Sequence, residues 1–187
     1  MTRHYTTEWS EVLQLGDLHV GMRLIRPEDK PLLLEGFEGL SFASRRTRFM
    51  GARSALTPAD LKLFTEVDQE NHLAIGAQDL DTGHPVGVAR CIRAPGTTRA
   101  EAAVTIVDAY QHHGLGTVLL DRLAEAALER GITTLRFVMT SDNVCMRHLA
   151  ERLKGHVARS HFERGTMTLD IELDGARPDE GPTLKAG

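Results

Sequence analysis

The stretch Glu101-Ala-Ala-Val-Thr-Ile-Val-Asp-Ala-Tyr-Gln-His-His-Gly-Leu-Gly-Thr117 decides how the rest of the chain is interpreted. Val104–Val107 is rich in β-branched residues, which predicts a strand. A turn at Asp108–Tyr110 follows, and a glycine-containing loop then runs into a helix expected over residues 114–130. Apolar residues recur along that segment at helical spacing, so the stretch predicts a strand, a loop and an amphipathic helix.

A loop that enters a helix in this way suits a phosphate. The first backbone N–H groups of a helix lack internal partners and carry partial positive charge from the helix dipole. Glycines have no Cβ atom, so a phosphate can approach the backbone closely. The residues expected to hold a pyrophosphate are Gln111, His112, His113, Gly114, Leu115, Gly116 and Thr117.

Three nucleotide-binding patterns compete for this loop. A P-loop needs Gly-Lys-Ser/Thr, but Gly116 is followed by Thr117. A dinucleotide fingerprint needs a third glycine where Leu119 stands. The pattern Gln/Arg-x-x-Gly-x-Gly/Ala fits Gln111, Gly114 and Gly116, and with it the chain resembles the GNAT superfamily of acyl-CoA-dependent N-acetyltransferases. The resemblance implies that the loop cradles the pyrophosphate of acetyl-CoA, the expected cosubstrate.

Composition is that of one globular domain. At 187 residues the chain is long enough to bury a core without disulfides. Its net charge of −4 offers no basic surface for nucleic acid, and no apolar stretch approaches membrane-spanning length. Cys91 and Cys145 form no pair motif, and the acidic N-terminus has no apolar signal segment. A cytoplasmic, reducing location is therefore expected.

The order of the expected elements indicates the fold. Strands are expected at residues 19–26, 72–78, 85–92, 101–107, 132–140, 156–164 and 166–173, and helices at 27–40, 41–49, 57–67, 114–130 and 143–153. The fold class is α/β (α+β). The resemblance implies the GNAT fold over residues 19–173, with a mixed central sheet of about seven strands flanked by helices.

The two ends of the chain are expected to lie outside that domain. Residues 1–18 are interpreted as an extension with a short docking helix, in which Trp9, Val12 and Leu13 share one face. A partner-binding arm is the alternative. Residues 174–187 have almost nothing to bury and are expected to be a disordered tail.

The basic side of the helix expected at residues 41–49 allows two interpretations. We interpret it as a solvated face, and a role in gripping coenzyme phosphates is the alternative.

Acetyl transfer needs a base, because an amine must be neutral to attack a thioester whereas a lysine ammonium has a pKa near ~10.4. Glu101 is the candidate catalytic residue. It lies on the strand that leads to the phosphate loop, and Ala100, Ala102 and Ala103 leave it unshielded. An apolar wall would raise its pKa into the useful range. The alternative is an ordinary surface glutamate at the start of a strand.

Within the superfamily the chain looks most like the bacterial protein lysine acetyltransferases, which modify metabolic enzymes such as acetyl-CoA synthetase. The likeness rests on residues 101–111, on Ser141-Asp-Asn-Val-Cys-Met-Arg147 and on the segments 24–29 and 48–51. It implies that Glu101 is the general base. It also implies that Val104, Thr105 and Ile106 present backbone groups to the pantetheine arm and the thioester.

The chain departs from the family pattern at two places. His112 and His113 replace a small and a basic residue, and neutral histidine attracts phosphate less than arginine does. The pair has no third ligand at a recognisable spacing, so no metal is expected. The helix after Asn143 lacks the tyrosine that protonates the thiolate in many members, which leaves that step to water. Asn143 is expected to touch the coenzyme, to cap its helix, or to do both.

Three functions stay open. The first is acetyl transfer to protein lysines by direct attack in a ternary complex, since no cysteine is placed as a nucleophile. The second is the same chemistry on a small amine, such as a polyamine, an amino sugar or a drug. The third is a non-catalytic coenzyme A sensor, against which the presence of Glu101 argues. Regulation would come through residues 1–18, a partner or substrate supply.

Overall fold

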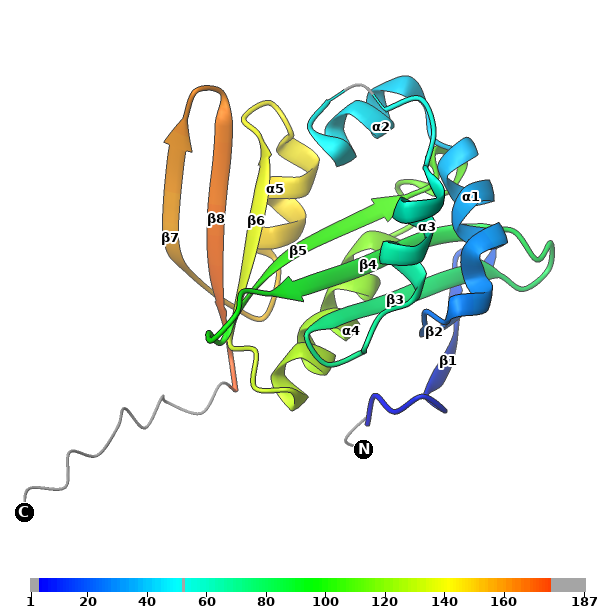
Figure 1. The fold of residues 1–187 in the computed structure, drawn as a ribbon, viewed down its shortest axis with the longest axis horizontal. Helices are drawn as coiled ribbons and strands as arrows, with labels where there is room; N and C mark the ends of the chain where they lie inside the picture. Colours follow the sequence, from blue (N-terminus) through cyan, green and yellow to red (C-terminus); the bar gives the residue numbers. More distant parts are fainter. Residues whose placement is uncertain (1–3, 52, 176–187) are drawn as a thin grey trace, which may run out of the picture.

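The computed structural model describes residues 4–51 and 53–175, which form one sheet with helices on both faces (Figure 1). The strands are β1 (Ser10–Leu15), β2 (Leu18–Leu24), β3 (His72–Asp79), β4 (Pro85–Arg93), β5 (Arg99–Ile106), β6 (Thr134–Thr140), β7 (Gly155–Glu163) and β8 (Thr166–Leu173). The α-helices are α1 (Lys30–Glu38), α2 (Phe42–Phe49), α3 (Pro58–Thr65), α4 (Leu115–Glu129) and α5 (Val144–Glu151). The expected mixed sheet flanked by helices is confirmed, with one strand more than expected.

The sheet has the order β1-β2-β3-β4-β5-β6-β8-β7 and is antiparallel except between β5 and β6. Those two strands run parallel because α4 carries the chain from the end of β5 back to the start of β6. They pair only between Arg99–Glu101 and Thr134–Arg136. Beyond these residues the strands diverge, and Figure 1 shows them separating toward their carboxyl ends.

The two faces of the sheet carry different helices. On one face α4 packs against β3, β4 and β5, and its Leu119 and Leu123 are fully buried. Burial of each such side chain contributes about 1.5–3 kcal/mol. On the other face lie α1, α2 and α3 (Figure 1), with a small second core made by Phe37, Leu40 and Leu56.

The helix predicted within residues 1–18 is wrong, because this segment contains strand β1. It forms a hairpin with β2, and Gly16 makes the turn with a φ of 61°. Two-residue hairpin turns require such positive φ values, which glycine adopts without strain. Trp9 and Leu13 pack against the core, whereas Val12 is 60% exposed, so the three residues do not share a face.

Docking of the N-terminal segment, by contrast, is confirmed. Tyr5 is only 2% exposed and belongs to the main core. Its hydroxyl donates to Glu125 at 2.5 Å and its backbone N–H donates to Glu129 at 3.0 Å, both on α4. Arg130 donates to the Tyr5 carbonyl at 2.6 Å. The first described residues are therefore part of the folded domain.

Two boundaries differ from the sequence prediction. The helix expected at 27–40 begins as a 3-10 turn, Pro27–Asp29, and α1 follows it. The buried Asp29 accepts two hydrogen bonds from Arg23, each 2.7 Å long, and one from the backbone of Arg26. At the other end, residues 174 and 175 form a turn after β8, and the rest of the predicted tail lies outside the described residues.

Candidate active site

Val104, Thr105 and Ile106 lie in the part of β5 that has left β6. On one side all three pair with β4, whereas on the other side β6 pairs with none of them. Backbone N–H and C=O groups inside a protein normally have partners, so this open edge offers hydrogen bonds to a ligand that lies between the strands. The residues stand where a splayed edge was expected. Their contact with pantetheine stays a prediction.

The loop between β5 and α4 contains two residues with left-handed backbone conformation directly before the amino end of α4. His112 has a φ of 67° and Gly114, the residue before the helix, has a φ of 82°. No side chain caps the first turn of α4. Gln111 donates from Nε2 to the carbonyl of Ile106 at 3.2 Å and so ties the loop to the end of β5. Uncapped N–H groups at a helix start are a ready phosphate site.

The two glycines of this loop have different tasks. A Cβ at Gly116 would lie 3.3 Å from Leu149 of α5, so the missing side chain lets α4 and α5 pack closely. A Cβ at Gly114 would meet nothing within 4 Å, so this glycine borders open space. Of the predicted loop residues, His112, His113 and Gly114 are exposed, Gln111 and Thr117 are half-buried, and Leu115 and Gly116 are buried.

Asn143 caps α5. Its side-chain oxygen accepts a hydrogen bond from the backbone N–H of Met146 at 3.0 Å. This bond satisfies one of the unpaired donors of the first turn. The capping role expected for Asn143 is thus present, and a coenzyme contact stays a prediction. Cys145 and His148 on this helix are both exposed.

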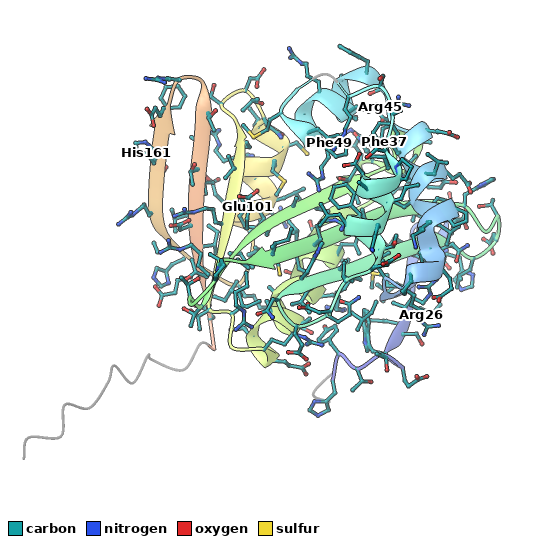
Figure 2. The ribbon with its side chains drawn as sticks, in the orientation of Figure 1. Arg26, Phe37, Arg45, Phe49, Glu101 and His161 are labelled. Atoms are coloured by element: carbon teal, nitrogen blue, oxygen red, sulfur yellow. The ribbon has the colours of Figure 1, made fainter. Side chains whose placement is uncertain are left out.

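Glu101 is the last residue of β5 that is paired on both sides, with Ile92 of β4 and Arg136 of β6. Its side chain is exposed, and Figure 2 shows it where the two strands come together. At about 3.3 Å per residue, Glu101 and Ile106 are about 17 Å apart along the strand. A single ligand must therefore be long and extended to reach both the candidate base and the predicted phosphate loop.

Two arginines contribute to the electrostatic surroundings of Glu101, Arg136 on the paired strand β6 and Arg48 on α2. Arg136 donates two hydrogen bonds to Asp170, at 2.7 and 2.8 Å, which raise its pKa, and the charge of Glu101 adds to that rise. Burial lowers the pKa of Arg48 on α2, and the charge of Glu101 partly opposes this effect. Neither arginine forms a direct ion pair with Glu101.

The basic residues of α2 do not form the solvated face that we expected. Arg45 donates to the carbonyls of Leu40 and Glu38 and lies 4.3 Å from the centre of the Phe37 ring. Arg48 faces the sheet, and Arg46 alone of the three is exposed. Sequence reasoning thus missed Arg48, and it also missed Arg90 of β4 on the same face of the sheet. Strand alternation around Glu101 could have indicated Arg90, because Arg90 lies opposite Ala103.

Within residues 4–51 and 53–175, no group of three or more histidine, cysteine or acidic side chains could hold a metal ion. Over the same residues, no helix is both long and apolar enough to cross a membrane.

Comparison with known proteins places these features in a family. Residues 42–155 match the sequence model of the Acetyltransferase (GNAT) family. Acetyltransferase PA5475 of Pseudomonas aeruginosa is 33% identical over 163 residues, which cover 86% of this chain and 87% of that protein. Acetyltransferase Pat of Mycolicibacterium smegmatis is 30% identical over 153 residues, or 81% of this chain but only 45% of Pat.

Solved structures share the fold. The GNAT domain of S. lividans PAT superposes with a TM-score of 0.82 at 24% identity, covering 91% of this chain and 100% of that domain. The structure of yncA from Salmonella typhimurium, with its cofactor acetyl-CoA, superposes with a TM-score of 0.67 at 21% identity. That match covers 86% of this chain and 98% of yncA.

Proposed function

The chain belongs to the Acetyltransferase (GNAT) family, and from this premise we propose that it transfers the acetyl group of acetyl-CoA to lysine side chains of proteins, with Glu101 as general base. The observation that carries the proposal is the position of Glu101. It is exposed at the point where β5 and β6 diverge, at the opposite end of β5 from the phosphate loop.

Acetyl-CoA is the cosubstrate, and the residues present suit its parts. The pyrophosphate is assigned to the uncapped start of α4 and to the exposed loop before it. The pantetheine arm and the thioester are assigned to the open edge of β5 at Val104, Thr105 and Ile106. Backbone N–H groups of such an edge can hold the oxygen that becomes negative during attack.

Glu101 would take a proton from the acceptor ammonium. The freed amine then attacks the thioester carbonyl, the amide bond forms, the carbon–sulfur bond breaks and the thiolate leaves. A simple thiol has a pKa near ~8.5, so water can protonate this leaving group without an acid from the protein. This agrees with α5, which carries Cys145 and His148 where many members have a tyrosine.

The positions of both cysteines agree with direct attack in a ternary complex, without an acyl-cysteine intermediate. Burial raises the pKa of Cys91 to about 12, and its side chain is fully buried, so it is no nucleophile. Cys145 lies exposed on α5 rather than on the face of Glu101. The choice of a protein lysine as acceptor rests on the resemblance of residues 101–111 and 141–147 to the bacterial protein lysine acetyltransferases.

The test is acetyl transfer from labelled acetyl-CoA to candidate proteins, including acetyl-CoA synthetase, followed by mass spectrometry of lysine peptides. We expect labelling by the wild type and a rate lower by about 10²–10⁴-fold in Glu101→Gln, the usual contribution of a general base. Glu38→Gln, an exposed glutamate at the end of α1, is the matched control and should keep the wild-type rate. Equal rates in wild type and Glu101→Gln would remove Glu101 from the mechanism.

A further inference from the structure

The face of the sheet that carries Glu101 also holds a cavity. It has a volume of about 280 Å³ and is lined by residues of the strands β1–β5 and of the helices α1, α2 and α3. Its walls are mainly apolar and include Leu33, Phe37, Phe49, Phe64 and Val88. Small-molecule pockets in proteins start at about 300 Å³, so the space suits a ligand of the size of one amino acid. The ring centres of Phe37 and Phe49 are 5.8 Å apart, and Figure 2 shows the two residues close together below α2.

Arg90 reaches this cavity from β4 as a buried positive charge. It is 4% exposed, and burial lowers its pKa to about 9. Its Nη1 donates to the Phe64 carbonyl at 3.1 Å and lies 3.3 Å from His72 Nε2, while the guanidinium stacks 4.6 Å from the Phe64 ring. No carboxylate among the described residues forms an ion pair with Arg90. A buried charge without an opposite charge is costly, so the site favours an anion.

Arg48 adds a second positive charge to the same cavity. Arg48 and Arg90 both line the cavity, so the two guanidinium groups border the same space. Other arginines of this region are compensated. Arg23 is paired with Asp29 at 2.7 Å and Arg53 with Asp60 at 2.7 Å. Within the described chain, Arg48 has no such ion pair, so a carboxylate from a ligand would complete the pairing.

The carboxylate of Glu101 and the guanidinium groups of Arg48 and Arg90 are complementary to the ammonium and the carboxylate of a zwitterion. Glu101 lies on the same face of the sheet as Arg90 and two residues further along the strand pair, because β4 and β5 pair Arg90 with Ala103 and Ile92 with Glu101. An ammonium at Glu101 and a carboxylate at Arg48 and Arg90 would then be the two ends of one zwitterion. The apolar cavity beyond the arginines would take a hydrophobic side chain.

We propose that this chain also N-acetylates free α-amino acids with apolar side chains, bound through their carboxylate by Arg48 and Arg90. The activity rests on the proposed function, since it uses the same donor and the same base. Glu101 takes a proton from the amino acid ammonium, and the amine attacks the thioester carbon. The nitrogen of the tetrahedral intermediate gives its second proton to water as the carbon–sulfur bond breaks, the thiolate gains a proton from water, and the products are an N-acetyl amino acid and coenzyme A.

The test compares two acceptors that differ only in the carboxylate, L-phenylalanine and phenethylamine, with acetyl-CoA as donor and mass spectrometry of the products. We expect kcat/KM of the wild type to favour L-phenylalanine by about ten- to hundredfold, the worth of a charged hydrogen bond. In Arg48→Gln this ratio should fall about tenfold or more. Arg46→Gln, an exposed arginine on the same helix, should keep the wild-type ratio.

The outcomes separate this activity from the proposed function. Formation of N-acetylphenylalanine with a ratio that falls in Arg48→Gln supports the inference. An equal or lower rate with L-phenylalanine than with phenethylamine, while protein lysines are acetylated, overturns it and leaves the proposed function standing. A ratio that stays unchanged in both Arg48→Gln and Arg90→Lys overturns the role of the arginines. Failure to acetylate any amine overturns both.

Discussion

A substitution at Gly114 can separate an effect on acetyl-CoA binding at the loop before α4 from an effect on overall stability. It has a φ of 82°, and a Cβ added there would meet nothing within 4 Å. Gly165, in the turn between β7 and β8, has a φ of 81° and an equally open Cβ position. The substitutions Gly114→Ala and Gly165→Ala therefore impose the same backbone strain. Only the first places a methyl group at the start of α4.

The two effects have separate magnitudes. An alanine forced into the left-handed region costs about 1–2 kcal/mol, so both variants should lose about that much unfolding free energy. For a domain of this size the loss corresponds to a Tm lower by about 2–8 °C. Displacement of a phosphate from one backbone N–H should cost about 1.5–3 kcal/mol more, or a roughly tenfold to hundredfold weaker affinity for acetyl-CoA. This second loss is expected for Gly114→Ala alone.

Thermal unfolding gives the first quantity, and calorimetric titration with acetyl-CoA gives the second. We expect similar Tm values for the two variants and a weaker Kd only for Gly114→Ala. An unchanged Kd in Gly114→Ala would refute the assignment of the pyrophosphate to this loop. Equal weakening in both variants would show that the affinity reports strain in the whole domain.

The remaining predictions concern the ion pair beside Glu101 and the N-terminal segment. Asp170→Asn should lower the unfolding free energy by about 2 kcal/mol in urea titrations at pH 7. The hydrogen bonds from Arg136 lower the pKa of Asp170 in the folded protein. The wild type should therefore lose this stability progressively as the pH falls below about 4. A stability difference between the wild type and Asp170→Asn that does not shrink as the pH falls from 7 to 3 would contradict this. Tyr5→Ala should cost about 3–5 kcal/mol through loss of a buried ring, while Val12→Ala, at an exposed position, should change the free energy by less than about 0.5 kcal/mol.

Much of the fold could be predicted because local chemistry and tertiary contacts agree. The sequence predicts a helix that begins at residue 57, and there Thr57 and Asp60 form a capping box at the start of α3, with hydrogen bonds of 2.8 and 3.2 Å. The β-branched run before the glycine loop is a strand, and the predicted crossover helix makes β5 and β6 parallel. The prediction fails at β1, whose Glu11 turns inward to pair with Arg122 at 2.6 Å. That contact joins residues far apart in the chain, so no local pattern indicates it.

The sequence by itself indicated the family, the predicted phosphate loop at Gln111–Thr117 and the candidate base, because each depends on residue types at short, fixed spacing. Only the tertiary structure decided what surrounds that base. Strand pairing stops after Glu101, which opens the edge of β5. Helix α2 brings Arg48 over the same mainly apolar cavity that Arg90 of β4 borders, and α1 and α3 complete the walls of this cavity. Such contacts arise from the packing of separate elements, and the spacing of residues along the sequence does not indicate which side chains will be in contact.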